Sequence, residues 1–111
     1  MTRFLVLYRA PTSAREQMAQ ATPDQAKAGM ELWGRWAQKA DGAIVDMGAP
    51  LGEGRRLEAG AARQGDATIT GFSILEAASM EDALALLKDH PHFHTPSGSI
   101  EVLESLPMPE P

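Results

Sequence analysis

Two segments of this sequence are apolar on both faces when they are read as β-strands, and this feature limits the possible folds most. Residues 3–9 run Arg-Phe-Leu-Val-Leu-Tyr-Arg, and residues 67–77 place Leu75 on one face and Phe72 and Ile74 on the other. A strand that is apolar on both faces must be covered on both faces, which predicts a central position in a sheet. We therefore expect these segments to be the two middle strands of one sheet.

Two helices are indicated by their start and stop signals. Thr22 and Gln25 form a capping box at the start of the first helix, and Gly42 is expected as the left-handed residue after its end. Ser79 is the expected N-cap of the second helix, which Pro91 prevents from continuing. The expected buried positions are Ala26, Gly29, Met30, Trp33, Trp36, Ala37 and Ala40 in the first helix and Met80, Ala83, Leu84 and Leu87 in the second.

Two further strands complete the pattern. Residues 43–47 and 99–103 read as strands, and each carries a charged residue, Asp46 or Glu101, which favours positions at the sheet edges. The element order is then β-α-β-β-α-β. Two right-handed crossovers on one sheet predict an α+β, ferredoxin-like fold with a four-stranded antiparallel sheet and two helices on one face.

Composition and charge narrow the class of protein. The 111 residues are 43% hydrophobic, which predicts a single globular domain over residues 1–106 followed by a Pro-rich tail, 107–111. A net charge of −5 without a Lys/Arg cluster argues against nucleic acid and membrane partners. The chain has no cysteine, so disulfides and thiolate catalysis are excluded. With no signal-peptide pattern, the expected location is the cytoplasm.

The face of the sheet opposite the two helices is also expected to be buried. Two helices can cover only one face of a four-stranded sheet, yet both middle strands are apolar on both sides. A second copy of the chain is the simplest cover, which predicts a homodimer formed sheet to sheet, the dimeric α/β barrel arrangement. The alternative is that residues 51–66 fold over that face.

All three histidines lie within five residues: His90, His92 and His94. Imidazole titrates near neutrality and is the commonest metal ligand. Three roles fit this cluster. His90 can cap the second helix as a cation, the histidines can transfer protons or bind a ligand, or an extended segment can turn three rings toward a metal. No fourth ligand accompanies them, so no metal or other cofactor is assigned.

We expect a small organic molecule to bind in a cleft between the sheet and the helices. His90 is the candidate general acid/base, helped by His92 or by Asp46, which could orient an imidazole. Arg9 is the candidate for holding an anionic group of the substrate, with His92 as a second binding residue. For Arg9 and Asp46 a surface ion pair is the alternative. A non-catalytic ligand-binding or accessory protein is the alternative function.

Several short motifs, in order along nearly the whole chain, resemble those of one protein family. They are residues 4–11 (FLVLYRAP), 45–51 (VDMGAPL), 69–74 (ITGFSI), 83–87 (ALALL), 90–92 (HPH) and 99–102 (SIEV). The pattern is similar to that of the YCII-related (YciI-like) domain proteins. The resemblance implies a ferredoxin-like fold and a dimeric α/β barrel. One member of that family is a dehydrochlorinase of chlorinated hydroxyquinols, and some are found beside extracytoplasmic-function sigma factors.

The sequence departs from this family at two places. In the YciI branch a histidine near the start of the first helix pairs with an aspartate that precedes a proline after the second helix. This chain has Gln25 near the first of these positions and His90 directly before Pro91 at the second. The His–Asp dyad is therefore not carried over, and the Asp-Gly-Pro-Phe motif of the related branch is absent. The position that does correspond is His90-Pro91.

Overall fold

The computed structural model describes residues 1–109, and residues 110 and 111 of the predicted tail lie outside the described part. Its main sheet contains β1 (Thr2–Arg9), β2 (Ile44–Asp46), β5 (Ile69–Ala77) and β6 (Ser99–Glu104) in the order β2-β5-β1-β6. All neighbouring strands are antiparallel. The two segments that are apolar on both faces are therefore the middle strands, which confirms the predicted ferredoxin-like α+β fold.

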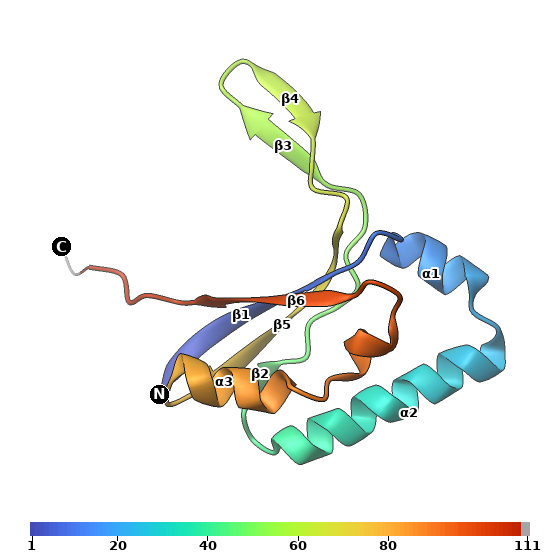
Figure 1. Ribbon diagram of the computed structural model, residues 1–111. Helices are drawn as coiled ribbons and strands as arrows, with labels where there is room; N and C mark the ends of the chain where they lie inside the picture. The colour runs from blue at the N-terminus through green and yellow to red at the C-terminus, as the bar shows by residue number, and fades with distance from the viewer. Residues whose placement is uncertain (110–111) are drawn as a thin grey trace.

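The long helix and the last helix pack against one face of this sheet (Figure 1). They are α2 (Pro23–Ala40) and α3 (Met80–Leu87). The capping box of Thr22 and Gln25 is present, and Ser79 accepts the backbone N–H of Asp82 at 3.1 Å. The core between sheet and helices is formed by Phe4, Val6, Tyr8, Leu75 and Ala77 from the strands, with Trp36, Ala40, Ala83 and Leu87 from the helices.

The predicted buried face of α2 is correct only for the second half of the helix. Trp36 and Ala40 are buried, whereas the side chain of Met30 is 76% exposed. In α3, Leu84 is half exposed and the neighbouring Leu86 packs against the core instead. The first half of α2 runs beyond the sheet, where α1 (Ala14–Gln20) joins it (Figure 1). Its apolar residues line an open cleft rather than the core.

Residues 51–66 do not cover the second face of the sheet. They contain a separate hairpin, β3 (Arg55–Glu58) and β4 (Ala61–Gln64), which projects away from the main sheet (Figure 1). All eight strand residues of this hairpin are exposed. The alternative in which this segment folds over the sheet is therefore wrong.

The outer face of the sheet, opposite the helices, is apolar at its centre. On this face Leu5 lies opposite Ile74 and Leu103, and Leu7 lies opposite Phe72. Leu5 is 37% exposed and Leu103 is 41% exposed, while the other three are half-buried. We call these five residues the outer sheet face.

Candidate functional site

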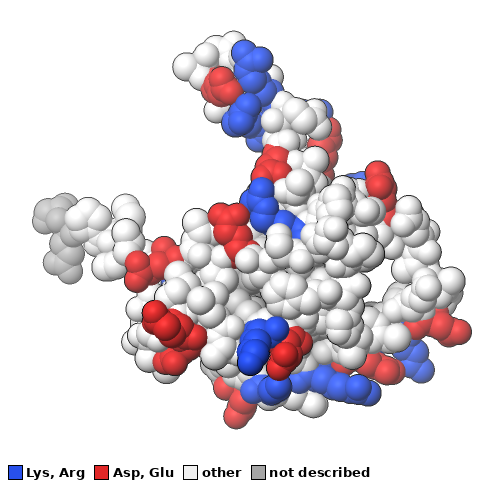
Figure 2. Space-filling model, viewed as in Figure 1, with Lys and Arg blue, Asp and Glu red and all other residues white. Residues whose placement is uncertain are grey.

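A cleft of about 850 Å³ lies between the sheet and the helices, where α1 and the start of α2 enclose it against one end of the sheet. Figure 2 shows its opening on the side where these helices arch away from the sheet. We call it the α1–α2 cleft. Its lining residues are mostly apolar or small: Ala14, Met18, Ala21, Ala26, Gly29, Met30, Trp33, Gly34, Met47, Gly48, Ala49, Pro50, Gly71, Phe72 and Pro91.

The wall formed by residues 47–51 is held against β5 by backbone contacts. The N–H of Leu51 donates to the carbonyl of Thr70 at 2.9 Å, and Pro50 forms a bridge with Gly71. Gly48 has a φ of +77°, and a Cβ atom at this position would overlap the carbonyl oxygen of Phe72. The close approach of these two chain segments therefore requires glycine at this position.

Three buried polar side chains line the same cleft: Tyr8, Thr70 and His92. The phenol of Tyr8 lies 2.7 Å from the Ser73 hydroxyl, which itself donates to the Met47 carbonyl at 2.7 Å. Because Ser73 has a single hydroxyl hydrogen, the Tyr8 hydroxyl must donate to Ser73. Burial raises the pKa of Tyr8 to about 12, so the phenol is protonated at neutral pH.

His92 is anchored to the end of β1 by its ring. Its Nε2 atom lies 2.8 Å from the backbone carbonyl oxygen of Arg9. A carbonyl oxygen can only accept, so Nε2 carries the hydrogen, and in the neutral ring Nδ1 is the nitrogen with a free lone pair. His92 is buried and lines the α1–α2 cleft, so its ring can contact a molecule bound there.

His90 occupies a different environment. It is 1% exposed, and its ring centroid lies 4.9 Å from that of Tyr8, 4.5 Å from that of Trp33 and 4.4 Å from that of Trp36. Burial, with a smaller effect of His92, lowers the pKa of His90 to about 3. The ring is therefore neutral at pH 7, and the predicted cationic cap of the preceding helix is wrong.

The lone pair of His90 is already used inside the protein. Its Nδ1 atom accepts the backbone N–H of His92 at 2.9 Å, which caps the 3-10 turn η1 (Pro91–His94). Its Nε2 atom is buried and has no hydrogen-bond partner within residues 1–109. His90 is absent from the lining of the α1–α2 cleft. The sequence predicts that His90 faces the ligand. In the structure His90 is buried behind the wall of the cleft instead.

Arg9 and Asp46 also lie elsewhere than the sequence analysis placed them. The guanidinium of Arg9 pairs with Asp66 and, at 2.9 Å, with Glu101 on the side of the sheet opposite the helices. Asp46 is exposed and accepts the backbone N–H of Gly48 at 2.8 Å. Neither side chain lines the α1–α2 cleft. For Arg9 the structure bears out the surface ion pair, and Asp46 stabilises a turn instead of orienting an imidazole.

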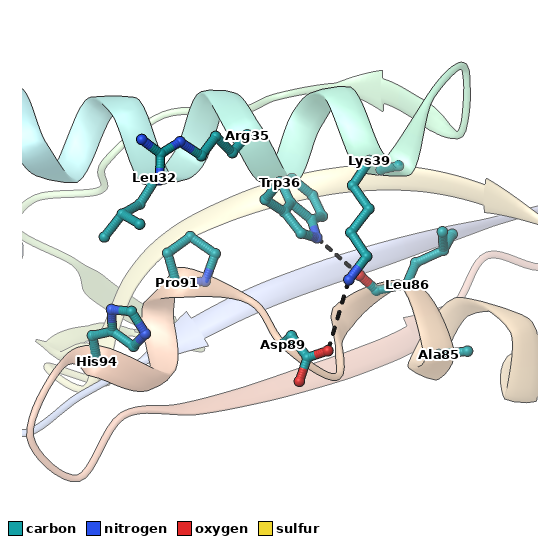
Figure 3. A pocket seen from close by; sticks show the side chains of 10 residues that line it. Leu32, Arg35, Trp36, Lys39, Ala85, Leu86, Asp89, Pro91 and His94 are labelled. Carbon is teal, nitrogen blue, oxygen red and sulfur yellow. Dashed lines mark hydrogen bonds and ion pairs between the residues drawn. The ribbon is translucent and has the colours of Figure 1, made fainter.

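The three histidines do not share one side. The segment forms a 3-10 turn instead of an extended strand, which sends His92 into the α1–α2 cleft and His94 into a second, smaller hollow of about 290 Å³ (Figure 3). That hollow lies between α2 and the end of α3, where Lys39 and Asp89 form an exposed ion pair of 3.8 Å. Within residues 1–109, no group of three or more His, Cys, Asp or Glu side chains is placed to hold a metal ion.

Sequence reasoning missed most of the cleft. The sequence pattern places Tyr8 and Thr70 in strands, and it predicts no functional role for them or for Met18. One signal was available: Gly29 and Met30 interrupt an otherwise Ala- and Trp-rich helix face. A small and a flexible residue side by side are unusual choices for a tightly packed core.

No protein-family model and no curated protein sequence matches this chain. Among solved structures, it is similar to the 5-chloro-2-hydroxyhydroquinone dehydrochlorinase of Burkholderia phenoliruptrix AC1100, in complex with 2,5-dihydroxybenzoquinone. The two share 17% identity and a TM-score of 0.47 over 89% of this chain and 90% of that chain.

The helices within residues 1–109 are too short or too polar to be membrane spans. The assignment of the ferredoxin-like α+β fold rests on the order and direction of the strands.

Proposed function

We propose that this chain is a cytoplasmic homodimer that binds a small organic molecule in the α1–α2 cleft and exchanges a proton with it through His92. The observation that carries the proposal is the placement of one buried imidazole ring on the wall of a large, mostly apolar cleft. Cofactor and substrate sites in proteins are concave, mostly apolar and supplied with a few fixed polar groups. The α1–α2 cleft has each of these properties.

The hydrogen bonds of His92 suit it to accept a proton. With Nε2–H donated to the Arg9 carbonyl, the free Nδ1 atom can take a proton from an O–H, N–H or C–H group of the bound molecule. The Arg9 carbonyl then stabilises the imidazolium that forms, and Nδ1 returns the proton to another atom of the molecule or to water. His90 acts as a positioning residue, because its ring holds the backbone of His92.

A non-catalytic binding protein is the second candidate function. One observation favours it: His92 donates to a neutral carbonyl oxygen rather than to a carboxylate, which would raise the basicity of the ring further. In that case the α1–α2 cleft holds its ligand without changing it. The two functions share the same binding site and therefore the same first test.

The outer sheet face is proposed to be the dimer interface, with a second copy of this chain as its occupant. Its apolar centre is bordered by two ion pairs, Arg3 with Glu76 at 3.7 Å and Arg9 with Glu101 at 2.9 Å. An apolar centre inside a polar rim is the usual anatomy of a protein interface. The same patch on two copies is self-complementary under a two-fold axis. The resemblance to YciI-like proteins supports the same arrangement.

Binding in the α1–α2 cleft is tested with the neutral fluorescent probe N-phenyl-1-naphthylamine. A Cβ atom added at Gly29 would meet no atom within 4 Å, and Gly29 lines the cleft, so Gly29→Leu is chosen to narrow the cleft from a position where the backbone tolerates a side chain. Ala28→Leu adds the same leucine at an exposed neighbouring position that does not line the cleft. We expect Gly29→Leu to weaken probe binding by at least about tenfold, which corresponds to 1.4 kcal/mol, and Ala28→Leu to leave it unchanged.

The position of His92 at the binding site is tested in the same titration by NMR. Addition of the probe should shift the ring proton resonances of His92, because the aromatic probe lies beside that ring. The resonances of His94, which lines the other hollow, should not move. Equal effects of the two leucine variants, or shifts at His94 alone, would contradict the proposed site.

A further inference from the structure

The three buried polar side chains of the α1–α2 cleft have one property in common: each has already donated its hydrogen to the protein. The hydroxyl of Thr70 donates to the Tyr8 carbonyl at 3.0 Å, and Nε2–H of His92 donates to the Arg9 carbonyl at 2.8 Å. A hydrogen bond between any of these three side chains and a bound molecule must therefore use a hydrogen of that molecule.

The hydroxyl of Tyr8 follows the same rule through a relay. Tyr8 donates to Ser73, and Ser73 donates to the carbonyl of Met47, each at 2.7 Å. The final acceptor of the relay is a carbonyl oxygen, which has no hydrogen to pass back, so the direction of both bonds is fixed. What Tyr8 can still offer is an oxygen lone pair.

The electrostatics of the lining restrict the ligand further. Among residues 1–109, those that line the cleft include no Lys, Arg, Asp or Glu. A charged ligand would lose its hydration there without gaining an opposite charge, which is costly in a low-dielectric site. Met18 and Met30 form part of the wall, and flexible thioether side chains adapt to ligands of different shape.

We infer that the ligand of the α1–α2 cleft is a neutral, largely apolar molecule that carries at least one O–H or N–H donor, which the acceptor atoms of Tyr8, Thr70 and His92 recognise. This inference rests on the proposed function, since it describes the occupant of the same cleft. The half-buried Gln17, Trp33 and Thr95 also line the cleft and carry polar hydrogens. Their polar atoms compete with water and so discriminate less between ligands.

The inference is tested with three naphthalene probes that differ in one substituent. 2-Naphthol is neutral and has a hydroxyl donor, 2-methoxynaphthalene has an acceptor only, and 2-naphthoate is an anion. We expect 2-naphthol to bind at least about tenfold more tightly than 2-methoxynaphthalene, and 2-naphthoate to bind most weakly, because unpaired buried acceptors and unpaired charges are both penalised. Quenching of Trp33, which lines the cleft, reports the binding.

Two variants identify the cause of the preference. Thr70→Val removes one acceptor and should reduce the ratio between 2-naphthol and 2-methoxynaphthalene, while Met30→Lys should raise the affinity for 2-naphthoate above that of the wild type. Met30 is exposed at the rim, so this variant keeps the core intact and remains informative if Thr70→Val does not fold.

The possible failures are distinguishable. If 2-methoxynaphthalene or 2-naphthoate binds as tightly as 2-naphthol, and Gly29→Leu abolishes binding of all three, the cleft binds ligands but the inferred chemical class is wrong. If none of the probes binds, or if Gly29→Leu has no effect on any of them, the proposed function itself is wrong.

Discussion

The backbone N–H of His92 donates a 2.9 Å hydrogen bond to the Nδ1 atom of His90, so that one histidine of the cluster positions the other. This bond fixes the tautomer of His90, whose remaining hydrogen lies on Nε2 among three aromatic rings. It also caps the 3-10 turn that presents His92 to the α1–α2 cleft. His90, which the sequence indicates as the functional residue, thus holds the backbone of His92, and His92 is the residue that lines the cleft.

The buried His90 should make the protein sensitive to acid. Its pKa is about 3 in the native state against 6.5 when free, so the unfolded chain binds a proton in this pH range that the native protein does not. Keeping His90 neutral therefore contributes fully to the unfolding free energy above pH 6.5, and this contribution is lost as the pH falls toward 3. Between pH 7.5 and 5 the loss should be about 2 kcal/mol.

His90→Asn tests this by denaturant unfolding at pH 7.5 and pH 5. Asparagine is a good N-cap residue and does not titrate, so the variant should lose about 2 kcal/mol less than the wild type between the two pH values. The comparison uses the pH dependence because the smaller side chain lowers stability at both pH values. His94→Asn, at an exposed position, is the control and should behave as the wild type. Identical acid sensitivity of His90→Asn and the wild type would show that His90 is accessible to protons.

Gly48 is predicted to be the most restrictive glycine of the chain. Gly48→Ala places a methyl group onto the carbonyl of Phe72 at a φ of +77°, and we expect it to cost at least about 3 kcal/mol of unfolding free energy. Gly60 has a similar φ of +83° but nothing within 4 Å of an added Cβ, so Gly60→Ala should cost only about 1 kcal/mol. Chemical denaturation of both variants measures the difference. Equal costs would mean that residues 47–51 do not lie against β5.

The outer sheet face is tested by the mass of the protein in solution. Light scattering should give twice the 11.9 kDa mass of the chain, and Ile74→Asp should give the monomer mass because it buries an unpaired charge in the interface. Leu57→Asp introduces the same charge on the projecting hairpin, where Leu57 is exposed, and should leave the mass unchanged. A wild-type protein that is monomeric at micromolar concentration would contradict the proposed dimer.

The sheet could be predicted from the sequence because its signals are local. Apolar residues on both faces of 3–9 and 67–77 specify central strands, and the charged residues Asp46 and Glu101 mark the two edges. The starts of α2 and α3 are also predicted correctly, because capping by Thr22 and Ser79 depends only on the next three residues. These features need no knowledge of distant contacts.

The candidate site could not be predicted in the same way, because it depends on where the chain leaves the sheet. The periodicity of α2 marks Met30 as buried, but the sheet ends before the first half of this helix, so the same apolar face lines a cleft. The alternation of His90, His92 and His94 predicts one shared side only for an extended chain. Pro91 instead begins a 3-10 turn, which separates the three rings.

The most direct test of the central claim uses the methyl groups of the six methionines as reporters of where a ligand binds. Met18, Met30 and Met47 line the α1–α2 cleft, whereas Met80 packs in the core and Met1 and Met108 lie near the chain ends. In protein labelled with ¹³C at the methionine methyl groups, saturating 2-naphthol should shift the resonances of the three cleft methionines and leave the other three in place. Shifts at Met1, Met80 or Met108 with none at the cleft methionines would show that the α1–α2 cleft is not the binding site.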